Sequence, residues 1–151
     1  MLDALDRALL DEMQRNNQQT HAVLGRRVGL SPSAVRRRLA RLRAEGVIQA
    51  DVSIVAPDPA AITVIVQVRY EKETLKSGQD FRRRMQDAPE VSQCYSVAGE
   101  TDFILVVHAP NLAAYEAWGE RTLMSDPLIL RYDSHVVWSR VKFSTVLPTF
   151  G

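Results

Sequence analysis

The sequence has little of what would place the protein in several common classes. It holds a single cysteine, Cys94, which excludes an internal disulfide. No apolar run reaches the roughly 18 residues of a membrane span, and no charged segment leads into an apolar stretch and cleavage site at the N-terminus. Its 151 residues are enough to bury a sizeable core without disulfides or metals. We therefore expect a folded cytoplasmic protein without a membrane partner.

Lysine is absent from residues 1–50, which hold nine arginines against five acidic residues, a net charge of +4. The remaining 101 residues hold ten basic and 13 acidic residues, so the net charge of +1 averages two regions of opposite sign. Such a basic run is typical either of a solvated helix face or of a nucleic-acid surface. Seven of the arginines fall in an 18-residue window without an acid: Arg26, Arg27, Arg36, Arg37, Arg38, Arg41 and Arg43.

Apolar spacing predicts that this basic region starts with two short helices. The first carries apolar residues at intervals of three and four, namely Leu2, Leu5, Leu9 and Met13. Thr20 can cap a second helix over residues 21–28. That helix ends at Gly29, because glycine adopts a left-handed backbone conformation at low cost.

A third helix is predicted from Pro32 to Glu45, since Ser31 is a good N-cap and proline suits the first helical position. A rotation of about 100° per residue gives this helix one apolar stripe, formed by Val35, Leu39 and Leu42. The opposite face alternates arginines with small residues: Ser33, Arg37, Ala40, Arg41 and Ala44. Three short helices joined in this way predict a helix-turn-helix.

The position of each arginine around the third helix suggests its role. Arg37 and Arg41 can approach the floor of a major groove, where arginine donates two hydrogen bonds to guanine. Arg36 and Arg43 flank the apolar stripe and are better placed for phosphates. For Arg38, an ion pair within the domain and a DNA contact are equally good interpretations.

Residues 24–48, LGRRVGLSPSAVRRRLARLRAEGVI, closely resemble the DNA-binding domain of the Lrp/AsnC (feast/famine) transcription regulators. The shared features are the Val-Gly-Leu-Ser-Pro-Ser turn, the basic helix and the Glu-Gly-Val-Ile exit. The resemblance implies a winged-type helix-turn-helix over about residues 20–39. Gly25 stands where the family more often has alanine, and meets the same need for a small residue. The candidate DNA-binding residues are Ser31, Ser33, Ala34, Arg36, Arg37, Arg38, Arg41 and Arg43.

The rest of the chain predicts a linker and a second domain. Residues 51–60 start with a short alternating strand and continue through two prolines, which suit an extended linker. We therefore expect a DNA-binding domain at residues 1–50 and a sensing and oligomerisation domain at 61–151. The latter has the order βαββαβ, which indicates an α+β fold with both helices on one face of an antiparallel sheet. The predicted strands are 62–70, 91–98, 103–109 and 129–138, and the predicted helices are 78–88 and 111–124, the latter capped by Asn111.

This order is also that of the ferredoxin-like sensing domain of the Lrp/AsnC family. Shared features are Pro-Glu-Val at residues 89–91, a Gly-x-x-Asp turn at 99–102 and a tail that ends in Leu-Pro at 147–148. The resemblance implies a homodimer formed through the sheet, assembly into an octamer, and a small effector such as an amino acid near the turn. The candidate effector-binding residues are Gly99, Glu100, Thr101 and Asp102. Glycine and aspartate are, however, common in any hairpin turn for backbone reasons alone.

The remaining residues with possible chemistry have simpler interpretations. The three histidines have no ligand-like spacing, so we expect neither a metal site nor a cofactor. Cys94 alternates within a strand and suits a small buried apolar role. Trp118 and Trp138 are expected to be core or subunit-interface residues.

The sequence therefore predicts a sequence-specific, effector-responsive transcription regulator that binds double-stranded DNA and is not an enzyme. An alternative is a sirohaem decarboxylase, since such enzymes share the two-domain architecture. They carry a histidine-containing stretch where this chain has AGETDFILVV, residues 98–107. The seven arginines, taken as uncompensated by acids, would also serve no purpose in a decarboxylase.

Overall fold

The computed structural model describes residues 1–71 and 74–149, which form two compact units. The helical unit comprises residues 1–55 together with residues 142–149, and the sheet unit comprises residues 56–141. The structure thus groups the end of the chain with the helical unit, whereas the sequence predicts that it belongs to the second domain. None of the helices in the described residues is long and apolar enough to cross a membrane.

The helical unit contains α1 (Ala4–Arg15), α2 (His21–Val28) and α3 (Pro32–Ala44). The predicted caps are confirmed: Thr20 and Ser31 each accept a hydrogen bond from the backbone of the helix that follows, and Gly29 ends α2 at a φ of 74°. The predicted apolar stripe of α3 is also buried. Seven buried side chains from the three helices form one core: Leu9, Leu10, Met13, Leu24, Val35, Leu39 and Leu42.

Residues 142–149 form an extended tail that is bound by α1. The side-chain amide of Gln14 donates to the Leu147 carbonyl at 3.0 Å and accepts from the Leu147 N–H at 2.6 Å. The Thr149 hydroxyl donates to Asp11 at 2.8 Å. Because one side-chain amide satisfies both backbone groups of Leu147, α1 recognises the tail by its main chain.

The short strand predicted at the start of residues 51–60 is wrong. Residues 51–58 have neither helical nor strand structure, and Val52, Ile54 and Val55 are exposed. An alternating sequence forms a strand only where a second strand supplies hydrogen-bonding partners. No described residue of this chain provides such a strand here.

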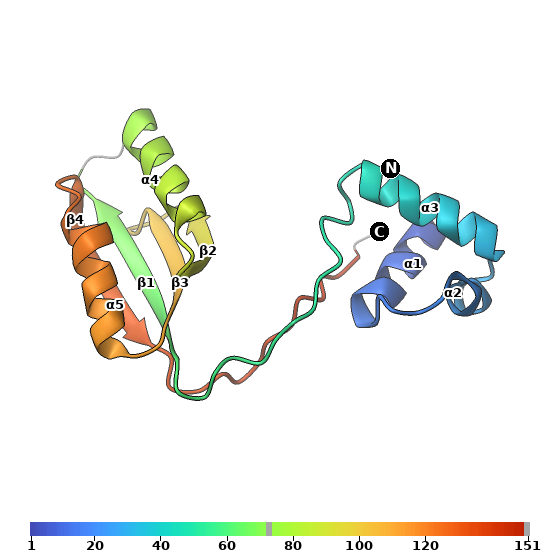
Figure 1. Ribbon diagram of the computed structural model, residues 1–151. Helices are drawn as coiled ribbons and strands as arrows, with labels where there is room; N and C mark the ends of the chain where they lie inside the picture. Colours follow the sequence, from blue (N-terminus) through green and yellow to red (C-terminus); the bar gives the residue numbers. More distant parts are fainter. Residues whose placement is uncertain (72–73, 150–151) are drawn as a thin grey trace. The chain divides into compact units, whose positions relative to one another are not determined.

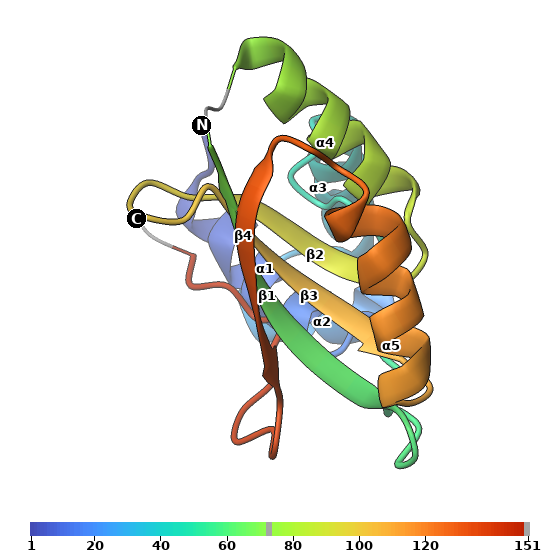
Figure 2. The ribbon, with the colours of Figure 1, turned by 90° about the vertical axis from the view of Figure 1, so that its left-hand side faces the viewer.

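The sheet unit has the predicted βαββαβ order, with strands arranged β2-β3-β1-β4 and each neighbouring pair antiparallel. Helices α4 and α5 lie on the same face of the sheet (Figures 1 and 2). This agrees with the ferredoxin-like α+β fold predicted from the sequence. The elements are β1 (Ile62–Tyr70), α4 (Leu75–Asp87), β2 (Val91–Ser96), β3 (Phe103–Ala109), α5 (Leu112–Gly119), a π-helical turn η1 (Glu120–Met124) and β4 (Ile129–Val136).

The core of this unit lies between the sheet and the two helices. Alternate residues of β1 and β3 point inward, and Phe81 and Met85, four residues apart on α4, pack against them. Trp118 of α5 is buried in the same core, and half-buried Cys94 packs against this core. Trp138, in contrast, lies beyond the end of β4 and is 99% exposed.

Several predicted element ends differ from those in the structure. Helix α4 starts three residues before Gly78, because Thr74 and Ser77 form a reciprocal capping box. The helix capped by Asn111 changes to a π-helical turn at Glu120. Strands β2 and β4 each end two residues earlier than predicted.

Candidate nucleic-acid interface

The helix-turn-helix presents one face of α3 to solvent. The turn is fixed by the positive φ of Gly29 and by Ser31, whose hydroxyl accepts from the Ala34 N–H at 3.2 Å. Ser33, Arg37 and Ala40 are exposed on the side of α3 opposite its buried stripe. Ala44 is exposed further along the same side, while Ala34 is half-buried. The small side chains leave the backbone of this face accessible, as a helix that enters a groove requires.

Two of the α3 arginines bind acidic residues at the start of α1, its N-cap Asp3 and Asp6. Arg41 donates through Nη2 to Asp6 at 2.6 Å, and its Nη1 lies 3.8 Å from Glu45. Arg38 donates through Nη1 to both Asp3, at 2.7 Å, and Asp6, at 2.8 Å. Of the two interpretations of Arg38, the ion pair within the domain is therefore present. Arg41 keeps a 40% exposed side chain.

Other arginines of the basic region are also paired. Arg43 donates to both carboxylate oxygens of Asp51, at 2.9 and 3.3 Å, and Arg27 binds Glu12 at 2.5 Å. The description of all seven arginines as uncompensated is therefore wrong for four of them. It failed because the acids lie outside the basic window and approach it only in the fold. Among the described residues, no acidic group lies within salt-bridge distance of the other three, Arg26, Arg36 and Arg37.

The acids in these pairs are held in the ionised form. Burial disfavours the charge of Asp6, but hydrogen bonds from Arg41 and Arg38 outweigh it and lower its pKa to about 2. The pKa of Asp3 is lowered by the Asp6 N–H and by Arg38. Arg27 lowers the pKa of Glu12, and Arg43 lowers that of Asp51. Asp3 and Asp6 also form a capping box at the start of α1, and their spacing of three in the sequence is the signal that could have identified it.

The predicted effector turn lies between β2 and β3, and the structure gives its residues backbone roles. Gly99 has a φ of 142°, which favours glycine. The Asp102 carboxylate accepts from the Tyr70 N–H at 2.7 Å, and the Asp102 N–H donates to Val68 at 3.0 Å. The turn is thereby tied to the end of β1. Glu100 is exposed, and Thr101 is half-buried and lies 3.5 Å from the Gln67 amide.

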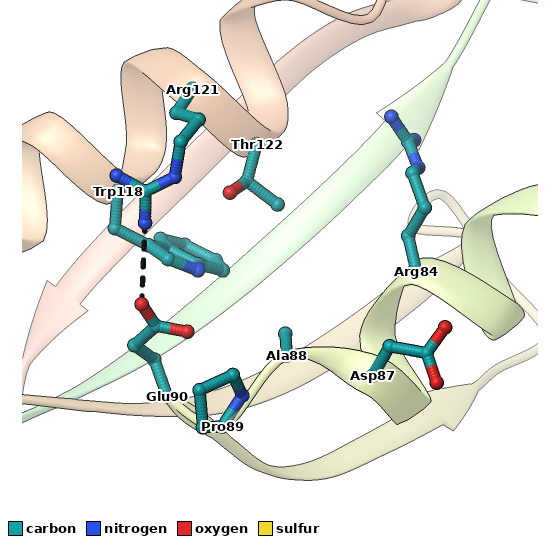
Figure 3. A pocket seen from close by; sticks show the side chains of 8 residues that line it. All are labelled: Arg84, Asp87, Ala88, Pro89, Glu90, Trp118, Arg121 and Thr122. Carbon is teal, nitrogen blue, oxygen red and sulfur yellow. Dashed lines mark hydrogen bonds and ion pairs between the residues drawn. The ribbon is translucent and has the colours of Figure 1, made fainter.

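A hollow of about 400 Å³ lies between α4 and α5 in the sheet unit. Figure 3 shows Trp118 and Arg121 on one side of it and Arg84 and Asp87 on the other. Arg121 pairs with Glu90 at 3.2 Å, and Arg84 pairs with Asp126. Its two arginines are therefore already neutralised, and none of the four predicted effector residues lines it. Within residues 1–71 and 74–149, no cluster of histidine, cysteine or acidic groups could hold a metal ion.

Two family models together match almost the whole chain. The model of the Lrp/AsnC ligand binding domain matches residues 63–147, and that of a winged helix-turn-helix DNA-binding domain matches residues 2–49. An uncharacterised HTH-type transcriptional regulator of Sinorhizobium fredii is 41% identical over 97% of this chain and 88% of its own. The leucine-responsive regulatory protein of Escherichia coli is 30% identical over 97% of this chain and 90% of its own.

Solved structures resemble the whole fold. An AsnC family transcriptional regulator from Agrobacterium tumefaciens has a TM-score of 0.87 and 30% identity, with 97% of each chain covered. A transcriptional regulator from Neisseria meningitidis, solved as a complex with L-Met, has a TM-score of 0.88 and 29% identity. That match covers 98% of this chain and 97% of the Neisseria chain. The agreement extends over both units.

Proposed function

The chain belongs to the Lrp/AsnC family of DNA-binding transcriptional regulators, and we propose that its helix α3 enters the major groove of double-stranded DNA. The observation that carries this proposal is the face of α3 on which exposed Arg37, without an acidic partner among the described residues, lies between the small residues Ser33 and Ala40. The Arg37 guanidinium has no hydrogen-bond partner within residues 1–71 and 74–149, so its N–H groups can make the two hydrogen bonds that recognise guanine.

Neighbouring residues complete the proposed interface. Arg41 has N–H groups beyond the one bound to Asp6 and can donate to a base. Arg36 is exposed beside this face and suits a phosphate, as does Arg43 if DNA displaces Asp51. Ser31, Ser33 and Ala34 lie at the N-terminal end of α3, where short hydroxyl side chains and the positive end of the helix dipole favour a phosphate.

The first prediction concerns base recognition by Arg37. A cognate duplex is first selected from random sequences by tight binding to the wild-type protein, and a scrambled duplex of equal length serves as the reference. Arg37→Ala should weaken cognate binding by about 1–3 kcal/mol and relax the base preference. Arg36→Ala, the comparison, removes an exposed cation placed for a phosphate and should weaken both duplexes similarly. Equal losses on both duplexes for Arg37→Ala would remove it from the residues that recognise bases.

The active species is proposed to be a homodimer that assembles further, up to an octamer. The sheet face that the helices leave open carries exposed Ile65 and Tyr95, and Trp138 is exposed beyond β4. Exposed apolar groups of this kind are typical of subunit interfaces. Two copies would place their α3 helices in successive major grooves of a palindromic site, about 34 Å apart. The mass in solution, measured by light scattering, tests this proposal directly.

An amino acid or a related small effector is proposed to bind at the turn formed by Gly99, Glu100, Thr101 and Asp102. Exposed Glu100 and the second oxygen of Asp102 could hold an ammonium group, and turn N–H groups could hold a carboxylate. The similar Neisseria meningitidis regulator was solved with L-Met, which supports an amino acid as the ligand class. A ligand that prefers one assembly would change DNA affinity through that preference.

The second prediction tests the effector site by thermal shift. Wild-type protein is screened against the twenty amino acids, and the amino acid with the largest stabilisation is then tested on Asp102→Asn. This variant keeps an oxygen for the Tyr70 N–H but loses the charge, so the stabilisation should be abolished. Asp58→Asn, which alters an exposed acid of the linker, is the control. An undiminished shift in Asp102→Asn would mean that the ligand binds elsewhere.

The enzyme alternative has less support. The chain keeps glycine and aspartate at the turn, which lies tied to β1, and the relatives described above are named as regulators. We therefore retain regulation, rather than catalysis, as the proposed role of the sheet unit.

A further inference from the structure

The Asp6 carboxylate is buried behind α3 and is bound by three donors. Its side chain is only 1% exposed, and it accepts from Arg38 at 2.8 Å, from Arg41 at 2.6 Å and from the Asp3 N–H at 3.2 Å. A buried carboxylate with two guanidinium partners carries a full negative charge only because those partners offset its loss of hydration. Asp6 therefore places one buried negative charge of α1 directly beside two arginines of α3.

Three arginines of α3 line one hollow and differ in whether they bind an acid. Arg38 bridges Asp3 and Asp6 and is 23% exposed, while Arg41 is bound on one side and exposed on the other. Arg37 lines the same hollow of about 290 Å³ as these two arginines, but has no acidic partner among the described residues. A phosphate near this hollow would therefore meet the full charge of Arg37 and two cations that are already neutralised.

We propose that Asp6 is a specificity-determining residue, which acts through Arg38 and Arg41 to suppress binding to arbitrary DNA. Attraction between free cations and phosphates supplies almost all sequence-independent affinity. Together with Asp3, the single negative charge of Asp6 offsets the charges of Arg38 and Arg41 and lowers that affinity, whereas the remaining N–H groups of Arg41 can still donate to a base edge. This inference rests on the proposed entry of α3 into the major groove.

The test is Asp6→Asn in the full chain, which removes the charge and keeps the size and one acceptor oxygen. Dissociation constants are measured on the cognate and scrambled duplexes over a range of salt. The scrambled duplex should bind about three- to tenfold more tightly, with a salt slope steeper by about 0.9 for each added phosphate contact. The affinity for the cognate duplex should change less, so the ratio of the two affinities falls.

A matched control separates this effect from net charge. Asp11→Asn makes the same charge change on the same helix and keeps an acceptor for Thr149. It should leave the affinity ratio and salt slope unchanged. In the double variant Asp6→Asn/Arg41→Ala, most of the gain on scrambled DNA should disappear. A folded Asp6→Asn protein with the wild-type ratio and slope would overturn the proposal.

A second variant keeps the proposal testable if Asp6→Asn does not fold. Asp3→Asn, at an exposed acid, removes the other negative charge beside Arg38 and keeps an acceptor for the Asp6 N–H, so it should also tighten scrambled-DNA binding. An unchanged affinity for scrambled DNA would overturn the idea that the acids beside Arg38 and Arg41 suppress that binding. If Arg37→Ala itself binds both duplexes like the wild type, the proposed placement of α3 fails instead, which distinguishes the two ideas.

Discussion

At the scale of single residues, Gly25 shows how closely α2 approaches the turn that follows it. The Leu30 N–H donates to the Gly25 carbonyl at 2.9 Å, and a Cβ added at Gly25 would lie 2.3 Å from the Leu30 carbonyl oxygen. The obstacle is backbone rather than the end of a flexible side chain. Gly119 in α5 differs, because an added Cβ would meet only the Tyr132 hydroxyl at 3.8 Å.

This contrast gives the third prediction. Gly25→Ala gains about 1 kcal/mol of helix propensity but must move the turn, at a cost of about 1–3 kcal/mol, so a net loss of stability is expected. Gly119→Ala has the gain without the clash and should stabilise the sheet unit. Urea unfolding followed by circular dichroism and by tryptophan fluorescence measures both. A midpoint for Gly25→Ala at or above that of the wild type would contradict the steric argument.

The candidate site residues also differ in how far the sequence could identify them. Helical spacing placed Arg37 on the exposed face of α3 without further information. The partners of Arg38 and Arg41 could not be found in that way, since Asp6 is separated from them by more than 30 positions and reaches them only through helix packing. The tie between Asp102 and Tyr70 is a similar long-range contact, with 32 positions between its partners.

At the scale of elements, the ion pairs of Asp6 join α1 to α3. The pKa of Asp6 is about 2 in the fold, against an ordinary value of 3.8. A lowered pKa means that the ionised carboxylate stabilises the fold above about pH 4, and that this contribution is lost as the pH falls from about 4 to 2.

The fourth prediction follows from the lowered pKa of Asp6. Urea unfolding of the wild type and of Asp6→Asn is compared at pH 5, 4, 3 and 2.5, at one protein concentration. The wild type should be the more stable at pH 5, and the difference in free energy of unfolding should shrink as the pH falls, since the amide that replaces the carboxylate does not titrate. A difference that stays constant with pH would show that Asp6 does not contribute through its charge.

Elements fixed by local chemistry could be predicted from the sequence, and those fixed by partners could not. Side-chain caps predicted the starts of α2 and α3, and the strands predicted at 62–70 and 103–109 match the observed ends of β1 and β3. The predicted strand at the start of residues 51–60 had the right alternation but has no described strand beside it. The sequence predicts that α4 starts at Gly78, whereas the capping box of Thr74 and Ser77 starts it earlier.

At the scale of the whole molecule, the tail makes the helical unit discontinuous in sequence. Residues 142–149 belong to it, although the entire sheet unit stands between them and residue 55. The Gln14 amide is the main anchor, through its two hydrogen bonds to Leu147.

The fifth prediction tests that anchor by limited proteolysis. Gln14→Ala removes both hydrogen bonds, so trypsin should release the peptide that follows Lys142 several times faster than from the wild type, with the peptide measured by mass spectrometry. Gln18→Ala, an exposed glutamine just beyond the same helix, is the matched control and should behave like the wild type. Equal release from all three proteins would show that Gln14 does not hold the tail.

The discontinuous helical unit has a consequence for synthesis on the ribosome. Its three helices are complete once residue 55 has been made, but residues 56–141 must be translated before the segment that covers α1 exists. At about 5–20 residues per second, this delay lasts roughly 5–20 seconds. During that interval Gln14 and Asp11 of the nascent chain are free to bind another extended backbone, including the tail of a finished copy.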